Sequence, residues 1–120
     1  MSDEGSLRFR FSHSPSGVIS GVAFKEDGDI VASFRLDVRK GSLRMQGKSW
    51  RSVTFTMVST KLGEKVYDIF GGILSKYGER DLRSQAWRVG RTRSRWRIRH
   101  DKMKRAVEEI KKALEKTHVL

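Results

Sequence analysis

At 120 residues, the chain has the length of one domain with a single hydrophobic core. Its 26 lysines and arginines outnumber 14 acids, which gives a net charge of +12 at pH 7. A surface this basic attracts polyanions, and it favours nucleic acid as a partner over an anionic membrane or an acidic protein. Cysteine is absent, which excludes disulfides, thiolate nucleophiles and cysteine-ligated metal sites.

No apolar run is long enough to cross a membrane, and Met1-Ser2-Asp3-Glu4 lacks the basic and then apolar pattern of a signal sequence. We therefore expect a cytoplasmic protein that does not bind membranes. Asparagine is also absent, whereas arginine, lysine and glutamate are abundant. High growth temperature tends to select such a composition, so a thermophilic source is predicted.

Three strands are predicted in the first third of the chain, after a flexible tail over residues 1–5. Ser6–Ser12 alternates apolar and polar side chains, which places its two arginines together on the outer side. Val18–Lys25 and Ile30–Arg39 follow, and Glu26-Asp27-Gly28-Asp29 between them is typical of a hairpin turn.

The loop of this hairpin sets which residues face the core. A three-residue loop pairs Phe24 with Ala32 and Val22 with Phe34, and it collects the apolar side chains on one face. The charged side chains of the second strand then lie on the other face. We predict this register.

After a connection through Lys40-Gly41, a longer strand is predicted to run to about Thr60, with a bend at Gly47. Its apolar side chains point to the core. Trp50 and three hydroxyl side chains point the other way.

Lys61–Tyr77 is predicted to be an amphipathic helix, because its apolar residues recur at intervals of three and four. Thr60 is the expected N-cap and Gly78 the expected C-terminal stop. Gly71-Gly72 inside this helix should cost about 1 kcal/mol per residue relative to alanine. Two explanations stay open, namely a close contact with a helix or subunit, and a local break of the helix.

Two strands, Leu82–Val89 and Arg93–Arg99, and a final amphipathic helix from Asp101 complete the predicted elements. The last helix alternates opposite charges on its outer side, as a solvated face does. Together the elements predict a single α+β domain over residues 6–120. Its order is β-β-β-β-α-β-β-α, an antiparallel sheet of five to six strands with two amphipathic helices packed on one face.

The predicted register of the last hairpin places Trp87 opposite Trp96 on the core side. On the exposed side, it places Arg88 opposite Arg95. Like charges that face each other across two strands destabilise a sheet unless an anion neutralises them. This pairing therefore favours a binding surface for an anion.

The exposed face of the sheet is predicted to be a basic platform. Every second residue from Arg93 to Arg99 is arginine, and strand geometry spaces these side chains about 6.6–6.8 Å apart on one face. Arginine stays charged, binds phosphate through two parallel N–H bonds and stacks on bases. The predicted nucleic-acid-binding residues are Arg8, Arg10, Arg35, Arg39, Trp50, Arg88, Arg91, Arg93, Arg95, Arg97 and Arg99.

Phosphate contacts of this kind predict salt-dependent binding with little sequence specificity. We expect single-stranded DNA or RNA as the partner, with Trp50 as a stacking surface. The alternatives are that Trp50 is a covered surface residue and that acids of neighbouring elements or of a second subunit neutralise the arginines. We also consider a homodimer, which would lengthen the contact surface, and a scaffold for an acidic protein. No catalytic residue, metal site or cofactor is predicted.

An endonuclease is the alternative from another functional class. From Asp27 onward, the order strand, strand, helix, strand, strand, helix resembles half of a LAGLIDADG homing endonuclease. The stretch Asp27-Gly28-Asp29-Ile30 is similar to the end of that family's acidic helix. The resemblance implies a metal ligand at Asp27, a sheet that saddles DNA and a metal-dependent enzyme that acts as a homodimer.

Overall fold

The computed structural model describes residues 5–88 and 90–120, and the side chains of residues 83–88 lie outside this description. Within these ranges it contains eight strands and two α-helices. Their bounds are β1 (Ser6–His13), β2 (Val18–Lys25), β3 (Ile30–Val38), β4 (Leu43–Met45), β5 (Lys48–Ser59), α1 (Gly63–Tyr77), β6 (Gly78–Arg88), β7 (Arg91–Arg99), α2 (Met103–Glu115) and β8 (His118–Val119).

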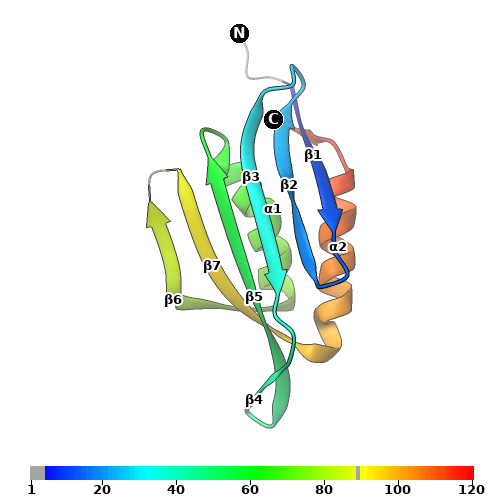
Figure 1. Ribbon diagram of the computed structural model, residues 1–120, viewed down its shortest axis with the longest axis vertical. Helices are drawn as coiled ribbons and strands as arrows, with labels where there is room; N and C mark the ends of the chain where they lie inside the picture. Colours follow the sequence, from blue (N-terminus) through cyan, green and yellow to red (C-terminus); the bar gives the residue numbers. More distant parts are fainter. Residues whose placement is uncertain (1–4, 89) are drawn as a thin grey trace.

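All strands belong to one antiparallel sheet, in the order β6-β7-β5-β3-β2-β1-β8, and β4 pairs with β5 outside this path. Both helices lie on the same face of the sheet and leave the other face open (Figure 1). The predicted α+β class, with two helices on one face, is therefore confirmed. The sheet has more strands than predicted, because β4 and β8 add to it.

The helices bury one apolar stripe each against the sheet. In α1 the stripe includes Phe70, whose ring packs on Phe55 with 4.5 Å between centroids and on Phe34 with 4.8 Å. In α2 it includes Ile110 and Leu114, which are both buried. These positions follow the helical spacing that the sequence predicts. The amphipathic patterns therefore identified both helices and their inward faces.

The glycine pair in α1 does not break the helix, which runs without interruption over Gly63–Tyr77. A Cβ atom on Gly71 would lie 3.3 Å from the Tyr67 ring and 3.8 Å from the Trp96 ring. Gly72 is exposed, and nothing lies within 4 Å of the position of its Cβ. The predicted local break is therefore wrong, and the nearest neighbour of Gly71 is Tyr67 of the same helix and not a second helix.

The start of α1 differs from the prediction. The residue before the helix is Leu62, which adopts a left-handed conformation (φ 59°), and no side chain caps the N-terminus. Thr60 is therefore not the N-cap. Gly78 ends the helix as predicted, and its N–H donates to the Leu74 carbonyl.

The register of the β2–β3 hairpin differs by one residue from the prediction. Gly21 lies opposite Phe34 and Ala23 opposite Ala32, so small residues of β2 face the helices while Val22 and Phe24 lie on the open face. The register shifts between Ala23 and Phe24. Large rings on the neighbouring strands fill the space above Gly21, and a Cβ atom there would also collide with the Arg10 carbonyl of β1.

The segment predicted as one bent strand is a hairpin. β4 pairs with the first residues of β5, and its turn passes through Gln46 and Gly47, which both have positive φ values of 54° and 71°. This β4–β5 hairpin extends beyond the rest of the sheet at one end (Figure 1). The turn was predicted only as a bend, because Gln46 is not a residue that usually signals a left-handed conformation.

The ends of the described chain meet at the edge of the sheet. β8 pairs with β1, and the Leu120 N–H donates to the Gly5 carbonyl (3.0 Å). Of the tail predicted as flexible, residues 1–4 lie outside the described residues. No helix in the described ranges is long and apolar enough to span a membrane.

Candidate nucleic-acid interface

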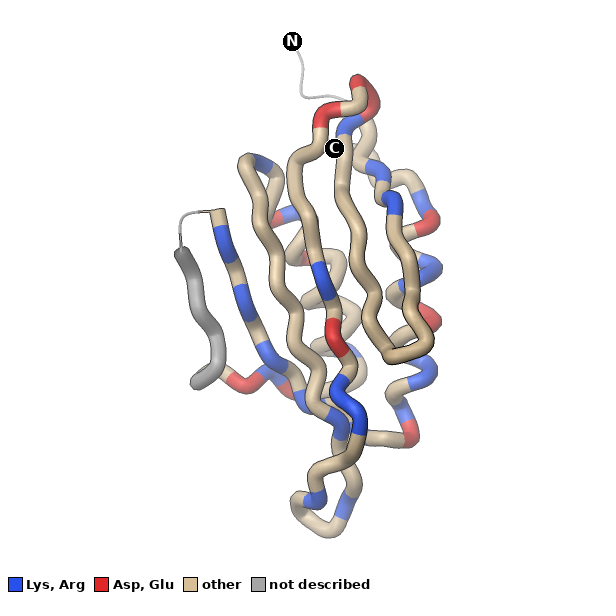
Figure 2. Tube along the Cα trace, in the orientation of Figure 1, with Lys and Arg blue, Asp and Glu red and all other residues tan. Residues whose placement is uncertain are grey.

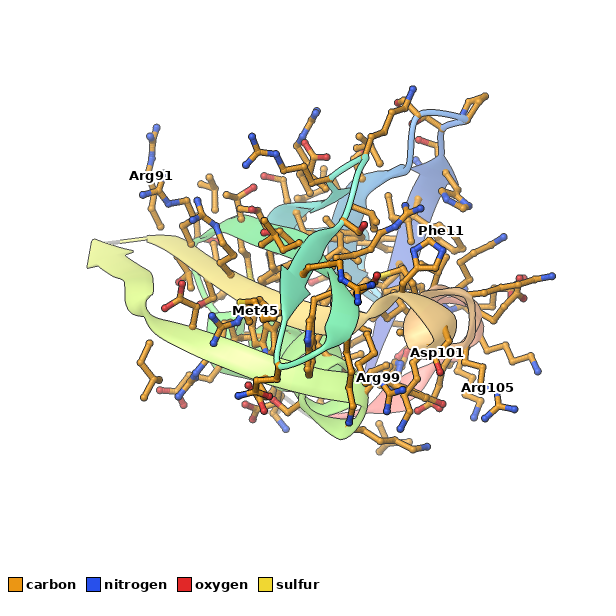
Figure 3. The ribbon with its side chains drawn as sticks, turned by 90° about the horizontal axis from the view of Figure 1, so that it is seen from below. Phe11, Met45, Arg91, Arg99, Asp101 and Arg105 are labelled. Atoms are coloured by element: carbon orange, nitrogen blue, oxygen red, sulfur yellow. The ribbon has the colours of Figure 1, made fainter. Side chains whose placement is uncertain are left out.

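β7 carries arginine at every second position, from Arg91 to Arg99. The residues between them, which include Trp96, are buried against the helices. The arginines therefore all lie on the open face, where the first three are exposed and the last two are half-buried. Figure 2 shows this row of positive charge along β7. In a view along the sheet, Arg91 points away from the helix layer that carries Arg105 (Figure 3).

β5 and β3 extend this surface beside the row. The outward residues of β5 are short. Thr54 and Thr56 each lie between an arginine of β7 and a residue of β3, and Ser52 lies between Arg97 and Arg39, the residue after β3. On β3, Arg35 lies opposite Thr56, and the Arg39 N–H donates to the Ser52 carbonyl (3.0 Å). Short hydroxyl side chains thus lie between arginines on two strands. We call this surface the basic face, and it comprises Arg35, Arg39, Arg91, Arg93, Arg95, Arg97 and Arg99.

The partner strand β6 differs from the prediction. Arg95 lies opposite Asp81 and not Arg88, because the register shifts between Asp81 and Ala86. Arg88 pairs with Arg91 instead, and its side chain lies outside the described side chains. The predicted pairing of Arg95 with Arg88 is therefore wrong, and the like-charge pair of this hairpin is Arg88 with Arg91.

The two tryptophans of the last hairpin do not face each other as predicted. Trp87 pairs with Thr92, and Trp96 pairs with Arg80. Trp96 is fully buried, which confirms its predicted place on the core side. Its indole N–H donates to the Ser75 hydroxyl of α1 (3.3 Å).

Few acids neutralise the basic face. Arg35 contacts Asp37 at 3.4 Å, and Arg97 contacts Glu79 at 3.9 Å. Arg99 contacts Asp101, which follows β7, at 3.6 Å. None of the other four arginines, Arg39, Arg91, Arg93 and Arg95, forms an ion pair with a described acid. Exposed ion pairs are worth about 0–1 kcal/mol, so a phosphate can replace the carboxylate in them.

Arg8 and Arg10 point to the open face but lie apart from the basic face. They belong to β1, four strand positions from β7, a separation of about 19 Å at the usual strand spacing. The Arg10 guanidinium sits over the Phe24 ring of β2, 5.5 Å from its centroid. Val22 and Phe24 occupy the surface between these arginines and β3. The structure therefore does not join Arg8 and Arg10 to the other predicted site residues.

Trp50 is not an open stacking surface. It is 7% exposed, and its indole N–H donates to the Met45 carbonyl (3.2 Å). β4 pairs with this end of β5, and Leu43 lies directly opposite Trp50. The alternative interpretation of Trp50 as a covered residue is therefore correct.

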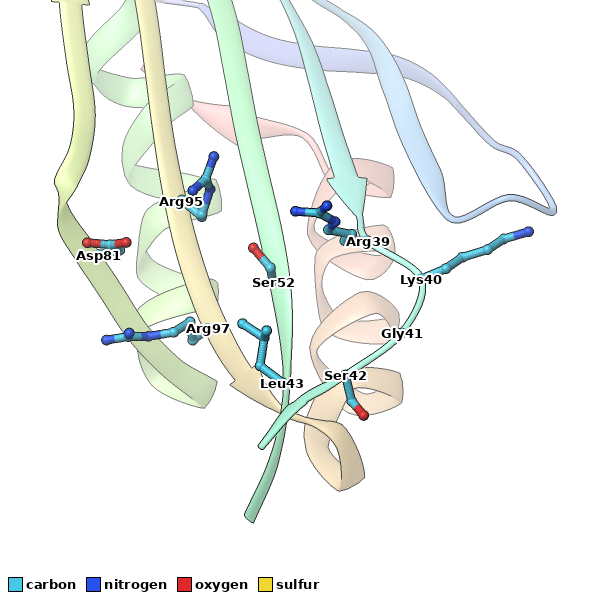
Figure 4. A pocket seen from close by; sticks show the side chains of 9 residues that line it. All are labelled: Arg39, Lys40, Gly41, Ser42, Leu43, Ser52, Asp81, Arg95 and Arg97. Carbon is cyan, nitrogen blue, oxygen red and sulfur yellow. The ribbon is translucent and has the colours of Figure 1, made fainter. Parts of the chain in front are cut away.

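A hollow of about 390 Å³ lies where the connection between β3 and β4 crosses the basic face. Four cations line it, Arg39 and Lys40 from one side and Arg95 and Arg97 from the other. Figure 4 shows that Arg39 points toward Ser52, whereas the side chain of Lys40 points away from it. The remaining lining residues are Gly41, Ser42, Leu43 and Asp81.

Arg97 is held at the closed end of this hollow. Its Nη1 atom lies 3.9 Å from the Met45 sulfur, and its Nη2 atom lies 3.9 Å from a Glu79 oxygen. Its Nε atom is buried and has no hydrogen-bond partner among the described atoms. A buried donor without a partner costs about 1–3 kcal/mol.

Sequence reasoning missed Lys40 and Ser42 as residues of this surface. Both precede β4 in the chain. Lys40 was assigned to a connection and Ser42 to the strand predicted after it. Lys40 directly follows Arg39, and Gly41 with a positive φ of 85° lets the chain turn across the sheet. The available signal was the pair of consecutive cations, Arg39 and Lys40, before a glycine. The sequence did not indicate in which direction this connection crosses the sheet.

The acidic turn that carries the homing-endonuclease resemblance is an ordinary hairpin turn. The Asp29 N–H donates to the Asp27 carboxylate (2.9 Å), and Asp27 contacts Lys25 at 3.9 Å. Ser20–Lys25, where that family has its acidic helix, belongs to strand β2. Within residues 5–88 and 90–120, no group of three or more described histidines and acids is placed to hold a metal ion. The structural element that the resemblance requires is therefore absent.

Comparisons of this chain with protein-family models, with curated proteins and with solved structures find no match.

Proposed function

We propose that this protein binds single-stranded nucleic acid, DNA or RNA, along its basic face with little sequence specificity. The observation that carries the proposal is the arginine row of β7. All five of its guanidinium groups lie on the one face that the helices leave open. Three of them, Arg91, Arg93 and Arg95, form no ion pair with a described acid.

The spacing of the row suits an extended strand. Alternate residues of a β-strand repeat at about 6.6–6.8 Å, which is close to the separation of successive phosphates in an extended nucleic acid. One arginine can then contact one phosphate, with paired N–H bonds for each. Thr54 and Thr56 beside the row add hydroxyl donors for the same backbone.

The burial of Trp50 changes the expected source of affinity. Bases cannot stack on the buried Trp50 ring. The remaining sources of affinity are contacts with phosphates and the stacking of guanidinium planes on bases. Both are tolerant of sequence. Binding should therefore depend steeply on salt, because each phosphate contact releases counterions.

A competition titration tests the proposal. Single-stranded DNA, single-stranded RNA and duplex DNA of equal length are titrated at several salt concentrations, and affinity is plotted against salt on logarithmic axes. We expect both single strands to compete better than the duplex. A chain that binds none of them at low salt, or that prefers the duplex, contradicts the proposal.

A charge-matched pair of variants locates the binding surface. Arg93→Ala/Arg95→Ala removes two cations from the row, and Lys104→Ala/Arg105→Ala removes two from exposed positions of α2. The first variant should weaken binding and reduce the salt slope by about 1.4, since each phosphate contact on a single strand contributes about 0.7. The second should leave the slope unchanged. Equal effects of the two variants would show that net charge, and not the basic face, drives binding.

The proposal includes a cytoplasmic location, where nucleic acid is accessible. The homodimer and the thermophilic source stay predictions from the sequence. We do not extend the proposal to cleavage, because a strand occupies the place of the acidic helix.

A further inference from the structure

The two ends of the arginine row differ. At the Arg91 end the row reaches the first residue of β7, and its arginine is exposed. At the other end the β4–β5 hairpin meets the row, since Met45 contacts both Trp50 and Arg97. A nucleic acid strand that follows β7 toward Arg99 therefore meets the β4–β5 hairpin.

The hollow at this closed end concentrates positive charge. Arg39, Lys40, Arg95 and Arg97 line it from both sides, against one lining acid, Asp81. Arg39 and Lys40 make no ion pair with a described acid. The carboxylate nearest to Arg97 belongs to the exposed Glu79, at 3.9 Å. The three arginines among these residues alone exceed what the single negative charge of an internal phosphodiester neutralises, and the side chain of Lys40 points away from the hollow (Figure 4).

The hollow also offers neutral donors and an apolar contact. Ser42 and Ser52 bring hydroxyl groups, and Leu43 at its rim is 50% exposed. The buried Nε atom of Arg97 still lacks an acceptor among the described atoms. A compact anion with several acceptor oxygens, joined to a sugar that covers Leu43, would satisfy these groups together.

We propose that the hollow binds the terminal phosphate of a single strand, so that the protein recognises a phosphorylated end. The inference rests on the proposed binding of single strands. A terminal phosphomonoester carries a charge of about −1.5 to −2 at pH 7 and presents three acceptor oxygens, whereas an internal phosphodiester carries a single charge. A terminal group also fits where the strand can no longer continue.

Three oligonucleotides test the inference. They share one sequence of about 12 nucleotides and an internal fluorescent label, and they carry a phosphate at the 5′ end, at the 3′ end, or at neither. We expect one phosphorylated form to bind at least roughly tenfold more tightly than the unphosphorylated form. A tenfold change in affinity corresponds to the free energy of one additional charge-assisted hydrogen bond. Which end is preferred gives the direction of the strand along β7.

The pH dependence separates a terminal phosphate from a general charge effect. The second ionisation of a phosphomonoester lies near pH 6, so the preference should be large at about pH 8 and shrink at about pH 5. The measured quantity is the ratio of the two dissociation constants at each pH. This ratio cancels changes that affect both oligonucleotides equally.

Two arginine variants give the matched comparison. Arg39→Ala removes an exposed lining residue of the hollow, and Arg93→Ala removes an exposed arginine of the row that does not line it. Arg39→Ala should bring the ratio of the two dissociation constants close to one. Arg93→Ala should weaken the binding of both oligonucleotides and leave this ratio unchanged. Thermal unfolding of both variants checks that the fold is retained.

Two results would overturn the inference. If all three oligonucleotides bind with the same affinity at about pH 8, end recognition is wrong while binding of single strands stands. If Arg93→Ala abolishes the ratio as fully as Arg39→Ala does, the preference does not arise in the hollow. The absence of binding to any oligonucleotide would instead contradict the proposed function itself.

Discussion

The open face of the sheet and the outer face of the helix layer are both rich in charge, but they arrange it differently. On α2 acids and bases alternate, and Glu109 accepts hydrogen bonds from Tyr77 (2.6 Å) and Lys76 (2.9 Å) of α1. On β7 arginine follows arginine at every second position, and no acid interrupts the strand.

This difference shows that the pairing of charges carries more information than their number. Alternating charges on a helix interact with one another and stabilise it slightly, which is sufficient reason for their presence. A row of like charges on one strand gives no such benefit and adds repulsion. An external anion explains the second arrangement and is not needed for the first.

The largest expected effect is a difference in stability between variants on the two sides of β7. Trp96→Ala should lower the free energy of unfolding by about 3–5 kcal/mol, because a fully buried ring is lost from the core. Arg95→Ala, one residue earlier, should change stability by less than about 0.5 kcal/mol. Denaturant unfolding of both variants measures this. A large loss of stability in Arg95→Ala would mean that the basic face serves the fold.

The next effect concerns an acid within the basic face. Asp37→Asn frees Arg35 from its ion pair and should tighten binding to single-stranded DNA by up to about fivefold. Glu108→Gln on the exposed side of α2 makes the same change in net charge and is the control. If both variants tighten binding equally, the position of the acid does not matter and the comparison of the two faces fails.

A smaller effect distinguishes the two sides of α1. Gly72→Ala should raise the free energy of unfolding by about 0.5–1 kcal/mol, because the position is exposed and alanine favours a helix. Gly71→Ala should lose this gain, since its methyl group meets the Tyr67 ring at 3.3 Å. Thermal unfolding of the two variants provides the test, and an equal gain in both would contradict the close contact at Gly71.

The smallest effect is a pH dependence of the helix layer. Hydrogen bonds from Tyr77 and then from Lys76 hold the pKa of Glu109 below its ordinary value of 4.5. A lowered pKa in the folded state means that the stabilisation is complete above pH 4.5 and is lost as the pH falls through the folded pKa. Glu109→Gln should therefore show a shallower loss of stability below pH 4.5 than the native chain. Urea unfolding across this range measures it, and identical slopes would show that the pair contributes nothing.

The local patterns of the sequence predicted most of the fold. The spacing of apolar residues identified α1 and α2, and the alternation in β7 correctly placed Trp96 inside and the arginines outside. The hairpin registers were harder to predict. Irregularities near Ala23 and between Asp81 and Ala86 shift the partners of both hairpins, and they depend on the packing of neighbouring strands.

The sequence by itself determined which residues of a strand share a side, because the alternation of side chains in a strand is a local property of the backbone. It also placed the core side of β7 correctly, but not that of β2, where Val22 and Phe24 lie on the open face. Only the tertiary structure decided which residues meet across strands. It buried Trp50 in the β4–β5 hairpin, separated Arg8 and Arg10 from the row and placed Arg39 and Arg97 around one hollow. The burial of Trp50 depends on a turn at Gln46 and Gly47 that the sequence did not signal. The other two outcomes depend on contacts between residues far apart in the chain, which no local pattern encodes.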